Sequence, residues 1–322
     1  MTDERTELAN DFEIVPCLAC GSFVKSKVFK NIDRLHNFPG VFEINHCGEC
    51  GLIYVSPRPK NISQYYLQAY EPYNLDSQDF FQRLDSDLLA AYYEDKKGLK
   101  LWLKKTLYKI ICQPIPLEYR GKKILDLGCG NGLFLYNLQK YGKFEVCGVE
   151  MSDFAAEQAR TKLGLDVRTG TLANNVFLDN FFDIITLNHV LEHLPNPREI
   201  LLELKRILKS GGVIMLTTPN AKSFLARIFG KYWFALETPR HLNIFSKKSI
   251  LALIEKTEEL EIVKADYQIS NYVFVRSLVY FFNIKNKLLN SILMKVKVLF
   301  YPIFWLLPRD RRDFMTIQIK KK

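Results

Sequence analysis

The chain has 322 residues, of which 48% are hydrophobic and 25% are charged, with 16 Gly and 13 Pro. This balance is typical of a globular protein and excludes collagen-like, low-complexity and wholly disordered chains. Seven cysteines are too few for a disulfide scaffold. The odd cysteine number and a polar first stretch without a signal-peptide pattern indicate a reducing compartment, the cytoplasm.

The net charge of +10 is concentrated near the carboxyl end. Residues 272–322 hold eleven Lys or Arg and two Asp, a net charge of +9. A membrane-spanning helix needs about 18 or more uncharged apolar residues, and the longest candidate, residues 298–308, is too short. We therefore expect a soluble or peripheral protein.

Residues 1–58 contain two cysteine pairs, CLAC at 17–20 and CGEC at 47–50, separated by 26 residues. A two-residue gap lets both thiolates of a tight turn face one ion, and a glycine that tolerates positive φ follows each pair. The stretches at 22–30 and 41–46 are expected to be short strands, as in a zinc ribbon. A closed four-thiolate site favours a structural zinc over a catalytic zinc or a redox pair. The expected ligands are Cys17, Cys20, Cys47 and Cys50.

Residues 59–119 are expected to form a helical linker or cap. Apolar residues recur at helical spacing between 60 and 111, and Pro114 and Pro116 end the pattern. Tyr66 and Tyr70 could line a pocket, although aromatic residues at such spacing are more often core residues.

From residue 122 onward, apolar strands alternate with amphipathic helices, the helices being expected near 132–141, 153–163 and 197–209. This alternation predicts an α/β fold with a parallel sheet covered on both faces. Ligands of such sheets bind beyond the carboxyl ends of the strands. Functional residues are therefore expected directly after each strand.

The stretch DLGCGNG at 126–132 follows the first of these strands. Glycines without side chains let backbone amides approach a ligand closely where a strand turns into a helix. Glu150 closes the next strand, 24 residues after Asp126, where a carboxylate can accept both hydroxyls of a ribose. The glycine order is G-x-G-x-G, and not the G-x-G-x-x-G of dinucleotide-binding sites.

These residues resemble the first motifs of class I S-adenosylmethionine-dependent methyltransferases, and the resemblance covers roughly residues 120–270. It implies a Rossmann-like seven-stranded sheet, parallel with a terminal antiparallel hairpin, in a methyltransferase domain of residues 120–322. It also implies that S-adenosylmethionine is the cofactor. The implied neighbours of its methionine part are Asp126, Gly128, Cys129, Gly130 and Gly132. The ribose would be held by Glu150, the adenine contacted by Met151, Thr171 and Leu172, and the methyl flanked by Asn188 and His189.

The segment NHVLEHLPNP at 188–197 follows the fourth strand. Methyltransferases that act on nucleobase amines resemble one another in an Asn or Asp followed by Pro-Pro and an aromatic residue here, and this chain lacks that turn. The segment instead resembles the small-molecule and glycan branch, in which O- and C-methyltransferases predominate. His193 is a candidate catalytic residue, or it could simply cap the loop.

The segment PRHLNIFS at 239–246 follows the fifth strand and supplies the best candidate base, His241. A histidine beside the methyl has a pKa suited to removing a proton from a hydroxyl or an activated carbon. The string resembles the corresponding segment of sugar C-methyltransferases that carry a zinc ribbon, and of related O-methyltransferases. The alternative is a histidine at a helix start that pairs with a carbonyl. Ser246 is predicted to cap the next helix.

Residues 261–268 and 314–320 are predicted to form the terminal hairpin, with an insertion of 45 residues at 269–313 between them. This insertion is apolar and basic. A helix pair of this kind could contact a membrane surface, pack against the protein as a lid, or form a dimer face. Nucleic-acid binding through it is the least favoured alternative.

Three readings of function remain. The first is methylation of a sugar, a glycan or a related small molecule, which could be carried on a nucleotide or a lipid. The second is RNA methylation, with the ribbon and basic tail gripping phosphates. Residues 14–58 hold five Lys or Arg against three acidic residues, which is weak for that role. The third is a binding module with a vestigial cofactor fold, which the filled motif positions disfavour.

Overall fold

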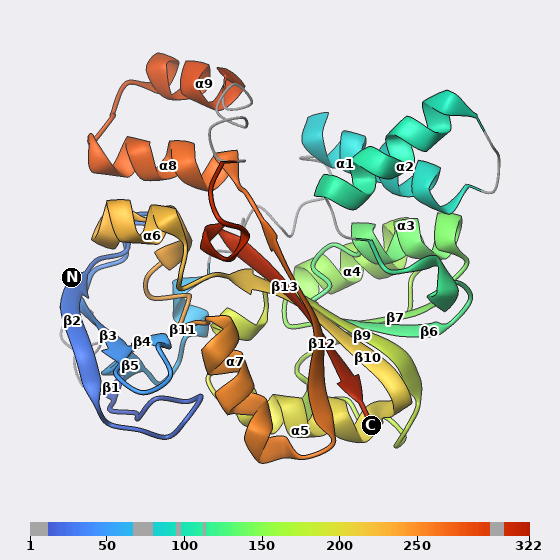
Figure 1. Ribbon diagram of the computed structural model, residues 1–322, viewed down its shortest axis with the longest axis horizontal. Helices are drawn as coiled ribbons and strands as arrows, with labels where there is room; N and C mark the ends of the chain where they lie inside the picture. Colours follow the sequence, from blue (N-terminus) through green and yellow to red (C-terminus); the bar gives the residue numbers. More distant parts are fainter. Residues whose placement is uncertain (1–11, 67–79, 95–97, 112–113, 297–305) are drawn as a thin grey trace.

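The computed structural model describes residues 12–66, 80–94, 98–111, 114–296 and 306–322. A seven-stranded sheet covered by helices on both faces forms the larger part, and a smaller sheet from the first sixty residues lies beside it (Figure 1). Within these residues, no helix combines the length and the apolar character needed to cross a membrane.

The large sheet has the strand order β12-β13-β10-β9-β6-β7-β8. Its strands are β6 (Lys123–Leu127), β7 (Glu145–Glu150), β8 (Val167–Thr169), β9 (Phe182–Asn188), β10 (Leu208–Pro219), β12 (Leu260–Gln268) and β13 (Phe314–Lys321). Strands β6 to β10 are parallel, whereas β13 runs antiparallel to both β10 and β12. The central strands bury nearly every residue because helices cover both faces. The predicted fold and its terminal hairpin are confirmed.

The helices that follow these strands begin close to the predicted positions. They are α3 (Leu133–Gly142), α4 (Asp153–Leu163), α5 (Pro197–Ile207) and α7 (Lys247–Ile254). Helix α5 ends two residues earlier than expected because Leu208 already belongs to β10. The predicted cap is confirmed, since the Ser246 hydroxyl oxygen accepts a hydrogen bond from the backbone N–H of Ser249 at 3.2 Å.

The segment expected to be helical between 60 and 111 is described at residues 60–66, 80–94 and 98–111, and it contains two helices there. It forms α1 (Phe80–Tyr93) and α2 (Leu99–Ile111), preceded by a single 3-10 turn at Ser63–Tyr65. Tyr70 lies outside the described residues. The buried faces of α1 and α2 meet each other and α3 through Tyr92, Tyr93 and Tyr108.

The small sheet has the order β11-β4-β3-β2 and is antiparallel. Its strands are β2 (Lys25–Asn31), β3 (Phe42–Cys47), β4 (Ile53–Val55) and β11 (Asn243–Ile244), and a separate pair joins β1 (Phe12–Glu13) to β5 (Arg58–Pro59). Strands β2 and β3 confirm the two predicted ribbon strands. Strand β11 was not expected, because two residues are too few to show a period-2 pattern. It brings the segment with His241 against the ribbon.

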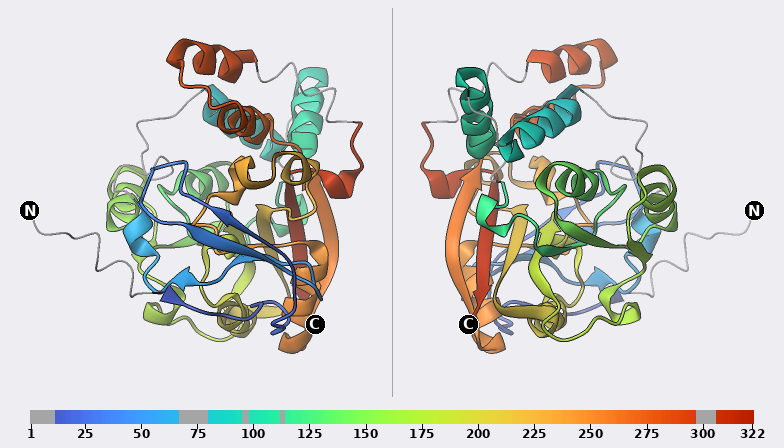
Figure 2. Two further views of the ribbon diagram at one scale, coloured as in Figure 1. Left: turned by 90° about the vertical axis from the view of Figure 1, so that its left-hand side faces the viewer. Right: turned by 90° about the vertical axis from the view of Figure 1, so that its right-hand side faces the viewer.

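The insertion forms α8 (Asn271–Phe281) and α9 (Lys287–Val296), and α6 (Phe224–Phe229) lies beneath α8. Helix α8 buries Val273 in an apolar cluster with Leu225 and Phe229 of α6. Figures 1 and 2 show that α8 and α9 stand at the same end of the molecule as α1 and α2.

Candidate functional site

Two buried carboxylates mark the carboxyl ends of β6 and β7. The hydroxyl of Thr186 donates a hydrogen bond of 2.6 Å to Oδ1 of Asp126. Burial raises the pKa of Asp126 to about 7, outweighing the opposite effect of that hydrogen bond. Asp126 can therefore exchange a proton near neutral pH, or become charged when a cation binds beside it.

Glu150 at the end of β7 is held by backbone amides. Its Oε2 accepts from the N–H of Gly130 and its Oε1 accepts from the N–H of Ser152, both at 2.8 Å. Burial raises the pKa of Glu150. Each carboxylate oxygen has a second lone pair, so both can still accept a hydroxyl proton from a ligand. The side chain is thus oriented for a diol.

The glycine loop between β6 and α3 is closely packed. Gly128 has φ of 71°, and a Cβ there would lie 2.5 Å from Cγ2 of Val190. Gly132 has φ of 78°, and a Cβ there would lie 2.7 Å from Leu165. Both positions therefore require glycine for conformation and for space. Gly130, with φ of 55°, presents its amide to Glu150.

The other predicted cofactor residues follow the four strands β6, β7, β8 and β9. The side chain of Cys129 points into an apolar cluster with Leu135 and Val167, so its backbone alone could face a ligand. Met151 is exposed. Thr171 caps the short turn after β8, where its hydroxyl lies 2.8 Å from Asn174. Leu172 is buried. Asn188 and His189, at the end of β9, are exposed.

The structure brings the two predicted catalytic histidines together. The ring centroids of His193 and His241 are 4.6 Å apart. Nδ1 of His241 lies 2.8 Å from the carbonyl oxygen of Ala235, and Nδ1 of His193 lies 3.1 Å from that of Arg240. A carbonyl only accepts, so we assign the proton of the His241 ring to Nδ1, which leaves a lone pair on its Nε2. Tyr66 Oη also lies 2.7 Å from Nδ1 of His193.

Two buried glutamates flank this histidine pair. Oε1 of Glu192 lies 3.2 Å from Nδ1 of His189, and Oε2 of Glu237 lies 3.7 Å from Nε2 of His241. Burial alone would raise the pKa of Glu192, but the hydrogen bond with His189 and the nearby imidazoles lower it to about 2. Burial also lowers the pKa of His193 to about 4. The site therefore holds neutral His193 beside ionised carboxylates. Sequence reasoning missed both glutamates, although each lies within four positions of a predicted histidine.

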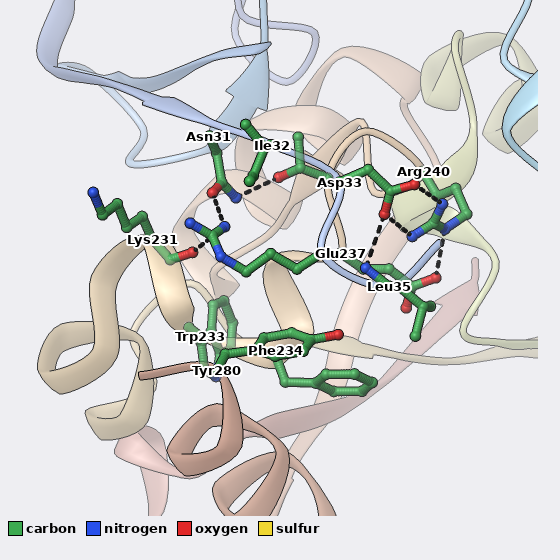
Figure 3. Close-up of a pocket in the computed structure, with 12 residues that line it drawn as sticks. Asn31, Ile32, Asp33, Leu35, Lys231, Trp233, Phe234, Glu237, Arg240 and Tyr280 are labelled. Carbon is green, nitrogen blue, oxygen red and sulfur yellow. Dashed lines mark hydrogen bonds and ion pairs between the residues drawn. The ribbon is translucent and has the colours of Figure 1, made fainter. Parts of the chain in front are cut away.

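A buried ion pair links this cluster to the ribbon. The carboxylate of Asp33, after β2, accepts from both terminal nitrogens of Arg240, at 3.0 and 3.1 Å. Both side chains are completely buried, and Nε of Arg240 donates to Glu237 at 3.0 Å. Figure 3 shows this pair beside a small pocket, with Trp233 and Tyr280 on its other side. The residue after Arg240 is His241, so the ribbon fixes the backbone of the predicted base.

The four ribbon cysteines form a compact thiolate cluster. The Sγ atoms of Cys17 and Cys50 are 3.4 Å apart and those of Cys20 and Cys47 are 3.5 Å apart, and all four lie within 4.8 Å of one another. Tetrahedral zinc with Zn–S bonds of about 2.3 Å places sulfurs about 3.8 Å apart, slightly more than the two shortest Sγ distances here. The donor set and its burial therefore fit a structural zinc. Gly21 and Gly51 have positive φ and close the two turns, as expected.

A second pocket lies between the sheet and the helices α1 to α3. Thr186 and Asn188 of β9 and Thr217 of β10 line its sheet side, and Tyr93 and Tyr108 line its helical side. Its lining thus combines polar side chains from the sheet with aromatic rings from the helices. It adjoins Asp126 through Thr186.

Comparison with known proteins finds a matching family model, described as "Methyltransferase domain", over residues 100–263. The chain is 31% identical over 193 residues to the ubiquinone biosynthesis O-methyltransferase of Pasteurella multocida (strain Pm70), which covers 52% of this chain and 78% of that protein. It is 32% identical over 139 residues to the protein of the same name from Glaesserella parasuis serovar 5 (strain SH0165), which covers 39% and 58%.

Solved structures are similar at lower identity. An S-adenosylmethionine-dependent methyltransferase of Thermotoga maritima is 24% identical, with a TM-score of 0.42, and covers 62% of this chain and 83% of its own. A coclaurine N-methyltransferase is 18% identical, with a TM-score of 0.42, and covers 70% and 74%.

Proposed function

Because this chain belongs to the methyltransferase domain family, and is therefore an S-adenosylmethionine-dependent methyltransferase, we propose that it methylates a hydroxyl or an activated carbon of a small molecule. The names of its relatives favour a hydroxyl acceptor. A sugar or glycan, carried on a nucleotide or a lipid, is the narrower acceptor class that we propose from the PRHLNIFS segment.

The proposed cofactor site is the carboxyl edge of β6, β7 and β9. Bound S-adenosylmethionine supplies a methyl group on a positively charged sulfur, which is already a strong electrophile. We propose that Glu150 holds the ribose, since both of its oxygens are oriented and keep a free lone pair. The glycine loop and Asp126 would surround the amino-acid end. Met151, Thr171 and Leu172 would contact the adenine, and Asn188 and His189 would flank the methyl.

We propose His241 as the base, assisted by His193, and one observation carries this assignment. The ring of His241 is anchored through Nδ1 on the carbonyl oxygen of Ala235, so its Nε2 keeps a lone pair for a proton, and the ring of His193 lies beside it. The carboxylate of Glu237, 3.7 Å from Nε2 of His241, would stabilise the imidazolium after the proton is taken up. Glu192 adds negative charge on the other side of the pair.

The ribbon is proposed to hold a structural zinc that supports this loop and takes no part in methyl transfer. The ion pair of Asp33 with Arg240 supports that role. A cytoplasmic location, with peripheral membrane contact through residues 272–312, is a further proposal.

Two measurements test the proposed cofactor and base residues. S-adenosylmethionine at about 100 times its dissociation constant should stabilise the protein by roughly 2.7 kcal/mol, and Glu150→Gln should weaken this stabilisation. Transfer of labelled methyl to a panel of phenols, catechols and sugar nucleotides would then identify the acceptor class.

With that acceptor, His241→Gln should lower turnover about 10²- to 10⁴-fold while cofactor binding is kept. The matched control is His46→Gln in ribbon strand β3, which should turn over normally. Normal turnover by His241→Gln would show that the base is a different residue.

A further inference from the structure

Helix α2 turns an apolar stripe toward solvent. Leu99, Trp102, Leu103 and Leu107 are all exposed, Trp102 to 60%. Their spacing of three, four and eight residues from Leu99 places them on one side of the helix. The opposite side is buried, where Tyr108 contacts α1. A surface helix normally directs its apolar stripe into the core, so this stripe requires another explanation.

Helix α9 and the turn before it repeat this arrangement. Leu288, Leu289 and Ile292 share one side of α9 and are exposed, Leu288 to 70%. Phe281 and Phe282 at the end of α8 are exposed as well. Two helices separated by more than 170 residues of sequence thus both present large apolar side chains to solvent.

The fold places these two helices at one end of the molecule. Helices α2 and α9 both project from the end at the top of Figure 1, and the views in Figure 2 agree. Beneath α2 lies the second pocket, which Tyr108 lines while its neighbour Leu107 is exposed. The apolar end is therefore on the same side of the sheet as this pocket.

The two stretches that carry these apolar side chains contain charge of one sign. Residues 96–117 and 269–309 each contain six Lys or Arg and no Asp or Glu. Within the described parts of these stretches, Lys100, Lys109, Lys285, Lys287 and Lys295 are exposed. Lysine stems can lie along an apolar surface while their ammonium groups reach outward. The end thus combines exposed apolar side chains with exposed lysines on the same two stretches.

We propose that α2 and α9 form one docking face for an anionic lipid membrane. Exposed Trp, Phe and Leu fit the boundary between headgroups and acyl chains, and lysines fit anionic headgroups. A second copy of this chain would bring the same positive charge to the face, which disfavours self-association. Nucleic acid would neutralise the lysine charges with its phosphates but would leave the leucine side chains exposed to water. This face adds α2 to the insertion and does not depend on the proposed acceptor.

Flotation of the full chain with vesicles tests this face. The chain should bind vesicles of phosphatidylcholine that contain phosphatidylglycerol, and binding should weaken in high salt or with phosphatidylcholine alone. The double variant Trp102→Glu/Leu288→Glu should lower the partition coefficient roughly tenfold or more. The double variant Lys100→Glu/Lys287→Glu should lower it by a similar factor.

The matched control is Val41→Glu/Val263→Glu, which places the same charges at exposed apolar residues outside both helices and should bind like the natural chain. Stabilisation by S-adenosylmethionine checks that every variant is folded. Absence of binding to anionic vesicles, or an equal loss in the control, would overturn the proposal. So would a dimer in solution that the Trp102→Glu/Leu288→Glu variant dissociates without any vesicle binding, because the face would then serve a second copy.

Discussion

Replacing Asp33 by Asn removes the negative charge of the buried ion pair with Arg240, which links the ribbon to the histidine cluster. Arg240 is completely buried and loses its bidentate partner, while its Nε keeps the contact with Glu237 at 3.0 Å. Removing one partner of a buried ion pair costs about 3–5 kcal/mol, because the other charge stays out of water. Since Glu237 still compensates part of that charge, we expect a loss of about 3 kcal/mol in the free energy of unfolding.

Urea unfolding and thermal unfolding measure this loss. About 3 kcal/mol corresponds to a fall in melting temperature of roughly 4–5 °C for a chain of this size. Glu43→Gln is the matched control, because the pair of Lys25 and Glu43 is one-third exposed and should contribute less than about 1 kcal/mol. The double variant Asp33→Asn/Arg240→Met should be more stable than Asp33→Asn alone, since no unpaired charge remains.

The effect has a defined dependence on pH. Burial alone would raise the pKa of Asp33, but the hydrogen bonds and charge of Arg240 lower it overall. A lowered pKa gives stability that is present above the ordinary pKa of about 4 and lost as the pH falls through the folded value. The difference between the natural chain and Asp33→Asn should therefore shrink in acid. If Asp33→Asn destabilised the chain at pH 7 no more than Glu43→Gln does, the argument that the buried pair of Asp33 and Arg240 stabilises the fold would be refuted.

Three further predictions concern the cofactor edge and the ribbon. Burial raises the pKa of Asp126 to about 7, so its ionisation destabilises the folded chain as the pH rises from about 4 to 7. In thermal melts, the stability of Asp126→Asn relative to the natural chain should therefore be greater at pH 8 than at pH 5. Gly128→Ala should lower the free energy of unfolding by about 1–3 kcal/mol and weaken cofactor binding in titration calorimetry, because it adds positive-φ strain and a close contact with Val190. Gly211→Ala is the control: it adds the same strain in open space and should leave cofactor binding unchanged. Cys17→Ser should lower the zinc content found by metal analysis and destabilise the chain; Cys147→Ser, outside the cluster, should retain the zinc.

Local signals in the sequence were sufficient for the fold and for expecting polar residues and glycines at the carboxyl ends of β6 and β7. The alternation of strands and helices, the glycine loop after β6 and the acid at the end of β7 each depend on residues close together in the chain. The cysteine spacing predicted a four-thiolate cluster for the same reason, and the Sγ distances agree with it. Capping by Ser246 likewise needs only its own helix.

The histidine cluster required the tertiary structure. Tyr66 and His193 are 127 positions apart, and Asp33 and Arg240 are 207 positions apart. Contacts over such separations leave no periodic pattern in one sequence, because they arise when β11 adds to the ribbon sheet and closes the chain on itself.

The proposed membrane face was likewise predicted from the sequence only in part. Sequence alone determined that residues 269–313 are apolar and basic. It did not reveal that α2 turns its own apolar stripe outward at the same end of the molecule. Periodicity gives the side of a helix that is apolar, whereas packing of the opposite side, here through Tyr108 against α1, decides whether that side meets the core or the solvent.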